Sequence, residues 1–98
     1  MTIFEKVMRV RRRVIFRHEL GYYGHVWLNS RKAIVINLML HERRIPSRTY
    51  FHECLHIVFP DLSEREIRTI EKAEWNVMTA NQRFLLARKL YNRKWKVR

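Results

Sequence analysis

The segment at residues 48–59 constrains the fold more than any other part of this 98-residue chain. Most of its residues are apolar, which is typical of a helix buried in a domain core. Pro46 ahead of the segment favours a helix start, with Ser47 as the expected N-cap, and Pro60 predicts the helix end. The fold must therefore bury one strongly apolar helix.

Three polar residues interrupt this helix: His52, Glu53 and His56. The order His-Glu-Cys-Leu-His is the H-E-x-x-H pattern, in which two histidines bind a zinc ion and the glutamate acts on a zinc-bound water. Positions i and i+4 lie on one helix face, so both imidazoles can point at a single metal. Glu53 projects beside that metal, where a general base would take a proton from the water.

A five-residue pattern can also arise by chance. At the chain's own frequencies of histidine and glutamate, random placement gives a match with a probability of roughly two per cent. The alternative interpretation is a buried helix whose histidines are hydrogen-bonded to backbone carbonyls. Two histidines and a glutamate in an apolar helix are costly without partners, which favours the metal site. Cys54, the one cysteine, cannot form an internal disulfide, and we expect a small buried hydrophobe there.

Length and composition indicate a single domain over residues 1–98. Apolar residues make up 47% of the chain and aromatic residues 12%, so there is material for a core and disorder is not expected. No apolar run is long enough to span a membrane, and the N-terminus lacks the apolar core of a signal peptide. We therefore expect a cytoplasmic protein with no membrane partner, and the oligomeric state stays open.

Basic residues exceed acidic ones, 21 against 9, which gives a formal net charge of +12. The basic residues gather at 9–13, at 43–44 and at 89–98. Such a balance favours phosphate backbones, through counterion release and long-range attraction. The alternative is a set of solvated helix faces, because no nucleic-acid-binding motif with its own spacing is present. Nucleic acid is therefore a candidate partner, through the basic surface.

The first part of the chain predicts one helix and a small antiparallel sheet. Thr2 and Glu5 form a capping box, and apolar residues at helical spacing extend the helix to about Arg13. Strands are predicted at 25–28 and 33–40, joined as a hairpin, with a possible third strand at 14–18.

Two further helices are predicted after the motif helix. Ser63 and Glu66 form a second capping box, and this helix continues with an apolar stripe of Ile67, Ile70, Val77 and Met78. Residues 79–81 interrupt it, and a final helix covers about 84–91. The predicted fold class is α+β: an N-terminal helix, an antiparallel sheet of two or three strands, the motif helix, a return helix and a C-terminal helix.

A hydrolytic zinc site usually has three protein ligands, and no histidine follows His56. The acidic candidates are Asp61, Glu64, Glu66, Glu71 and Glu74. The connection at 59–63 is short, so the next helix folds back and its first turn, with Glu64, meets the end of the motif helix. Glu71 is nearly two turns further along, on the same face as Glu64.

Each acidic candidate also has an ordinary explanation. Glu64 and Glu66 suit a helix N-terminus, and Glu71 can pair with basic residues on a surface. Glu74 falls inside the predicted apolar stripe, where it would orient a histidine ring. Glu64 is our first choice for the third ligand, with Glu71 and Glu74 as alternatives.

The chain resembles the small zincin metallopeptidases, and more closely minimal SprT-like and related phage or prokaryotic zinc metallopeptidase domains. The resemblance covers about residues 22–75 and rests on the strand at 33–40, the H-E-x-x-H helix and the Phe-Pro-Asp-Leu-Ser-Glu connection at 59–64. It implies a minimal zincin-like domain with 33–40 as its edge strand and a last ligand early in the next helix. SprT-like proteins have a histidine as third ligand, whereas this chain offers Glu64.

These observations predict a zinc metallopeptidase that hydrolyses peptide bonds. His52, His56 and Glu64 would bind Zn²⁺, Glu53 would activate the zinc-bound water, and a peptide substrate would add to the strand at 33–40. The resemblance and the basic charge together imply DNA-associated proteins as one substrate class. Two alternatives stay open: a basic nucleic-acid-binding or adaptor protein with a structural or degenerate metal site, and a phage-encoded interaction protein with a degenerate site.

Overall fold

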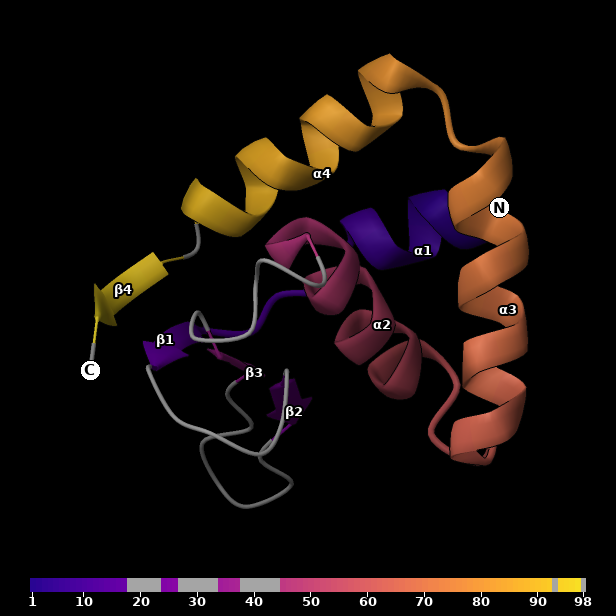
Figure 1. Ribbon diagram of the computed structural model, residues 1–98, viewed down its shortest axis with the longest axis horizontal. Helices are drawn as coiled ribbons and strands as arrows, with labels where there is room; N and C mark the ends of the chain where they lie inside the picture. Colours follow the sequence, from indigo (N-terminus) through magenta and orange to yellow (C-terminus); the bar gives the residue numbers. More distant parts are fainter. Residues whose placement is uncertain (18–23, 27–33, 38–44, 93, 98) are drawn as a thin grey trace.

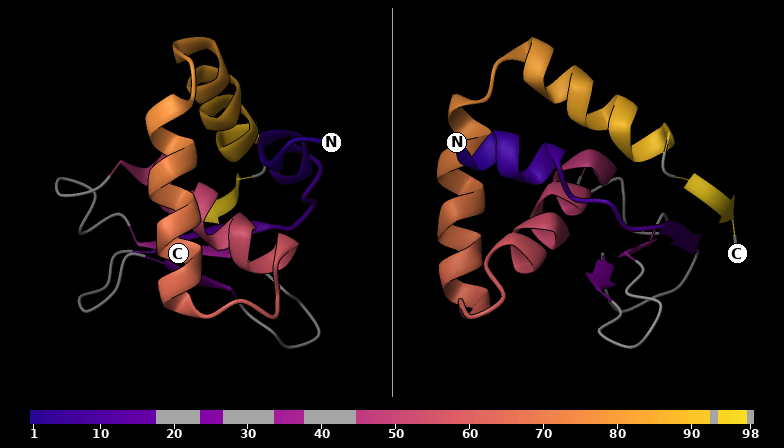
Figure 2. Two further views of the ribbon diagram at one scale, coloured as in Figure 1. Left: turned by 90° about the vertical axis from the view of Figure 1, so that its right-hand side faces the viewer. Right: turned by 180° about the vertical axis from the view of Figure 1, so that it is seen from behind.

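The computed structural model describes residues 1–17, 24–26, 34–37, 45–92 and 94–97. Its elements are α1 (Ile3–Met8), β1 (Val14–Arg17), β2 (Gly24–Val26), β3 (Ile34–Asn37), α2 (Pro46–Val58), α3 (Glu64–Val77), α4 (Ala80–Asn92) and β4 (Lys94–Val97). Helices and one small sheet make this an α+β fold, as the sequence predicts. The motif helix α2 lies at the centre, with the sheet on one side and the other helices around it (Figure 1, Figure 2).

The sheet is mixed rather than antiparallel. Its described strands run in the order β2-β3-β1-β4, with β1 parallel to both β3 and β4, and β2 antiparallel to β3. The predicted hairpin is therefore present as β2 and β3, and the third strand as β1. The prediction of an antiparallel sheet of two or three strands is wrong, because β1 pairs with β3 instead of its sequence neighbour β2, and β4 adds a fourth strand. The predicted hairpin connection and the strand ends at 18, 27–28, 33 and 38–40 lie outside the described residues.

Strand β3 is an inner strand of this sheet. It lies between β2 and β1, so the described part of the predicted strand, Ile34–Asn37, does not supply the edge that we expected to hold a peptide. Among the described strands, the two edges are β2 and β4. Because β2 also packs against α2, a sheet edge does lie next to the motif helix, but it belongs to the preceding strand.

Helix α1 ends at Met8, earlier than the predicted Arg13. Its capping box is confirmed, with Glu5 N donating to Thr2 Oγ1 and Thr2 N donating to Glu5 Oε1. Val10 and Val14 are buried as their spacing suggests, but Val10 lies just after α1, where its N–H donates to Val7 O, and Val14 lies in β1. The β-branched pair Val14 and Ile15 favours strand, and pairing with β3 outweighs continuation of the helix.

Helix α2 supplies the centre of the core. Tyr50, Phe51, Cys54 and Leu55 are fully buried among residues of α1, the sheet, α3 and α4. Burying each large apolar side chain stabilises the fold by about 1.5–3 kcal/mol. This burial fixes where the polar residues of the same helix must lie.

The start of α2 differs from the prediction. Ile45 is the N-cap and makes no side-chain cap bond, and Pro46 is the first helical residue. Ser47 lies inside the first turn and is therefore not the N-cap. Proline suits this position because its φ angle is preset and it lacks an N–H that would be unpaired.

Helices α3 and α4 form the outer layer. The capping box of Ser63 and Glu66 is confirmed at the start of α3. Helix α3 ends at Val77. Thr79 and Gln82 make reciprocal side-chain–backbone hydrogen bonds at the start of α4. The buried side of α3 is Ile67, Glu71, Trp75 and Met78. Val77, which we placed on the apolar stripe, is 74% exposed.

Candidate metal centre

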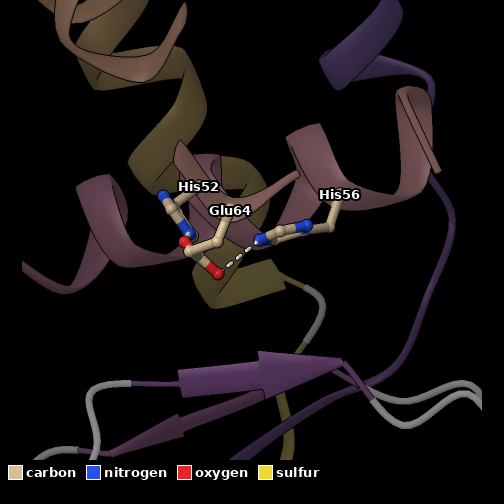
Figure 3. A group of neighbouring side chains, drawn as sticks. All are labelled: His52, His56 and Glu64. Carbon is tan, nitrogen blue, oxygen red and sulfur yellow. Dashed lines mark hydrogen bonds and ion pairs between the residues drawn. The ribbon is translucent and has the colours of Figure 1, made fainter. Parts of the chain in front are cut away.

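The two motif histidines lie one helical turn apart on α2, as their spacing predicts. Their ring centroids are 5.0 Å apart, with the rings inclined at 71°. His52 is buried, whereas His56 is half-buried near the end of the helix. Both rings therefore belong to the helix side that faces the start of α3, and one of them reaches towards solvent (Figure 3).

Glu64 meets both histidines. It is the first residue of α3, and the short return at 59–63 brings it back against α2. Its Oε1 lies 2.5 Å from His52 Nε2, and its Oε2 lies 3.1 Å from His56 Nε2 (Figure 3). Glu64 is thus the acidic candidate whose carboxylate lies between the two rings, and we call His52, His56 and Glu64 the metal group.

Glu71 contacts the same histidine from the opposite side. It is only 2% exposed, and its Oε1 accepts a hydrogen bond of 2.5 Å from His52 Nδ1. Glu71 faces Nδ1 of the ring, whereas Glu64 faces Nε2. The two carboxylates are therefore not alternative ligands for one metal ion bound at Nε2. Glu71 instead holds the ring of His52 in place, the role that we had considered for Glu74.

Arg48 completes this support. Its Nε donates to Glu71 Oε2 over 2.5 Å, and its guanidinium lies 5.7 Å from the centre of the Trp75 ring. The cation balances a carboxylate that would be costly to bury alone. Arg48 and His52 are four residues apart on α2, so one helix face presents both groups to Glu71.

Glu74 lies one turn beyond Glu71 and is half-buried. Within the described part of the chain, it makes no hydrogen bond or ion pair with either histidine. The apolar stripe that we assigned to α3 ran through Ile70 and Val77, which placed Glu74 inside it. The buried stripe runs through Ile67 and Trp75, and this places Glu71 inside it instead.

The charges around His52 favour its protonated form. Burial acts to lower the pKa of His52, but the hydrogen bond to Glu71 and the negative charges of Glu53, Glu71 and Glu64 outweigh it, so the pKa is raised. Burial acts to raise the pKa of Glu64, but the neighbouring His52 and His56 outweigh it, so this pKa is lowered. The negative charges of the carboxylates in this site thus favour a positive charge on or beside His52.

The contact between His52 Nε2 and Glu64 shows where this positive charge is needed. His52 Nδ1 already donates its proton to Glu71, because an ionised carboxylate can only accept. A bare Nε2 would then direct its lone pair at a carboxylate oxygen only 2.5 Å away, which is repulsive. A positive charge is required between these two atoms, either a second proton on the ring or a metal ion.

The donor set fits a zinc ion. One ligand atom from each member of the metal group can be chosen so that all three lie within 4.8 Å of one another. Two imidazole nitrogens and one carboxylate oxygen are typical zinc donors. Three protein ligands of this kind leave one position for a water or a substrate.

Glu53 and Cys54, two of the three residues between the histidines, are both buried. The negative charge of Glu53 contributes to the raised pKa of His52, so its carboxylate is within electrostatic reach of the metal group. Burial raises the pKa of the Cys54 thiol to about 12. A thiol with such a pKa stays protonated and is a poor ligand or nucleophile, in agreement with the prediction of a buried hydrophobe.

Comparison with protein-family models, with curated proteins and with solved structures finds no match for this chain. No helix among the described residues has both the length and the apolar character needed to cross a membrane.

Proposed function

We propose that this protein is a zinc-dependent peptidase, with His52, His56 and Glu64 as ligands and Glu53 as the general base. The observation that carries the proposal is the position of Glu64, whose two oxygens face the Nε2 atoms of both motif histidines. Chance can place the H-E-x-x-H letters in a sequence. It does not explain a carboxylate from another helix at the point where the two rings converge.

Each residue of the site has a distinct task. Zinc, when bound by such a donor set, lowers the pKa of a coordinated water and polarises a substrate carbonyl. Glu53 would take a proton from the attacking water and deliver it to the leaving amine. Glu71 holds the proton on His52 Nδ1, which leaves Nε2 as the nitrogen that would bind an ion. Arg48 balances the charge of Glu71.

The substrate we propose is an extended peptide that adds to the edge of the sheet beside α2. Strand β2 has a partner on one side only among the described strands, and it packs against the motif helix. An added strand gains backbone hydrogen bonds without requiring a particular side-chain sequence. This replaces the strand at 33–40 that the family resemblance suggested, and a zincin-like arrangement of edge strand and motif helix remains part of the proposal.

Metal analysis and two amide substitutions test this function. We expect about one zinc per chain after purification without chelator, and hydrolysis of a fluorescently labelled unfolded protein such as casein. Glu53→Gln should keep the zinc and lose hydrolysis, whereas Glu64→Gln should lose both. Glu74→Gln is the matched control, because it makes the same chemical change on α3 without a contact to either histidine.

The proposal fails if wild-type protein neither contains zinc nor gains thermal stability when zinc is added. It also fails in part if Glu53→Gln hydrolyses the substrate as fast as the wild type, since Glu53 would then have no role as a base.

A further inference from the structure

Basic and acidic residues are separated along the chain. Six of the nine acidic residues lie between residues 53 and 74, around the metal group. None lies at 75–98, where there are seven basic residues, and none at 6–18, where there are six. These two acid-free stretches contain α4 and the end of α1. Figure 1 shows α4 along the outside of the molecule, far from the turn between α2 and α3.

Helix α4 carries two exposed aromatic rings with an arginine between them. Phe84 is 62% exposed and Tyr91 is 52% exposed, and Arg88 is exposed as well. Spacings of four and three residues place all three within about 60° around the helix axis. We call Phe84, Arg88 and Tyr91 the α4 stripe. It lies opposite Leu86 and Leu90, which anchor α4 in the core.

An open hollow borders the α4 stripe. It has a volume of about 450 Å³ and is lined by Met8, Leu85, Arg88, Lys89 and Asn92. Lys89, one of the lining residues, is held by two hydrogen bonds. Its Nζ donates to Val10 O over 2.6 Å and also to the Tyr50 hydroxyl. The segment that follows α1 is thereby joined to α4, and this segment carries the exposed Arg9 and Arg11.

We propose that this face, made of the α4 stripe, the hollow, Arg9 and Arg11, binds single-stranded nucleic acid. A chain of phosphates complements a surface to which the adjoining sequence contributes positive charge and no carboxylate. Exposed aromatic rings offer stacking positions to unpaired bases, and the arginine between them reaches a phosphate or a base. A duplex hides its base faces and would leave both rings unused, so the ligand class is single-stranded. This inference does not depend on zinc or on hydrolysis.

Fluorescence anisotropy of a labelled oligothymidylate, titrated with the full chain, tests this inference. Phe84→Leu keeps an apolar side chain but removes the ring, and it should weaken binding roughly tenfold, the scale of one base–aromatic stack. Phe84→Trp should restore or improve the affinity. Arg88→Gln should lower the slope of log affinity against log salt by about 0.7, the value for one phosphate contact on a single strand.

Two matched controls lie on α3. Val77→Ala changes another exposed apolar residue, and Arg65→Gln removes another exposed arginine, and both should leave the affinity unchanged. Equal affinity in Phe84→Leu and wild type would overturn the proposal. So would a duplex of the same length that binds as tightly as the single strand, since stacking on the α4 stripe would then contribute nothing. Because the readout is binding alone, a failure of the peptidase proposal leaves the result interpretable.

Discussion

The metal group and the α4 stripe use side chains in opposite ways. In and around the metal group, buried side chains have fixed polar partners: His52 lies between Glu64 and Glu71, and Glu71 lies between His52 and Arg48. On the α4 stripe, the two rings and the arginine are exposed on one side of one helix. A small ion needs donors placed to within a fraction of an ångström, whereas a flexible polymer needs charge and rings at a suitable spacing.

Glu53→Gln should have the largest effect and should affect only one of the two regions. Removal of a general base typically costs about 10²–10⁴-fold in rate. Zinc content and oligothymidylate affinity should both stay at wild-type values, because Glu53 is neither a proposed zinc ligand nor a member of the α4 stripe. Hydrolysis rate, metal analysis and anisotropy on one preparation measure all three, and a loss of nucleic-acid binding would show that the regions are not independent.

Glu71→Gln should have the next largest effect. An amide accepts from His52 Nδ1 less strongly and no longer neutralises Arg48, so zinc affinity should fall by about 10–100-fold. Competition with a chromogenic chelator measures the affinity. Glu74→Gln is again the control on α3, and equal zinc affinities in the two variants would show that Glu71 does not support His52.

The effect of pH on the stability of the zinc-free protein should be smaller but has a definite sign. The pKa of His52 is raised above 6.5, so the stabilising effect of its protonated form is complete below that pH and is lost as pH rises through the folded-state pKa. The pKa of Glu64 is lowered below 4.5, so its effect is present above that pH and is lost on acidification. With chelator present, the pair should therefore stabilise the fold most between about pH 4.5 and 6.5.

Zinc must displace the second proton of His52, the one on Nε2. The rise in melting temperature on adding zinc should therefore be larger at pH 8 than at pH 6. Scanning fluorimetry at pH 6, 7 and 8, with zinc or with chelator, measures this difference. A zinc effect that grows on acidification would contradict the assignment of His52 as a ligand.

The double substitution Arg9→Gln and Arg11→Gln should have the smallest effect on the fold. Both side chains are on the surface, so stability should change by less than about 0.5 kcal/mol for each. Zinc affinity should not change, while the salt slope for oligothymidylate should fall by about 1.4, or 0.7 for each lost phosphate contact. An unchanged slope would limit the nucleic-acid face to α4.

Local signals in the sequence predicted local structure well. The capping pairs at Thr2 and Ser63 set two helix starts, and the apolar segment between Pro46 and Pro60 predicted the buried motif helix. The place of Glu64 followed from one physical limit, since the five residues between α2 and α3 allow only a tight return. That limit brought the first turn of α3 to the histidines.

Features that depend on partners distant in sequence could not be predicted in the same way. The pairing of β1 with β3 rather than β2 is a choice among strands of similar composition. β4 has the alternating sequence Lys-Trp-Lys-Val, which is too short and too basic to stand out from a charged tail. Glu71 could be assigned to His52 only after Trp75, rather than Val77, was known to face the core.

The pairing of β1 with β4 joins residues about eighty positions apart. During synthesis, β1 leaves the ribosome early, but β4 emerges only after the four helices that the structure describes. Until then that edge of β1 presents unpaired backbone groups, which readily pair with strands of other chains. Folding of this protein on the ribosome is therefore expected to finish late, and protection of the nascent β1 edge by a chaperone would raise the yield of native protein.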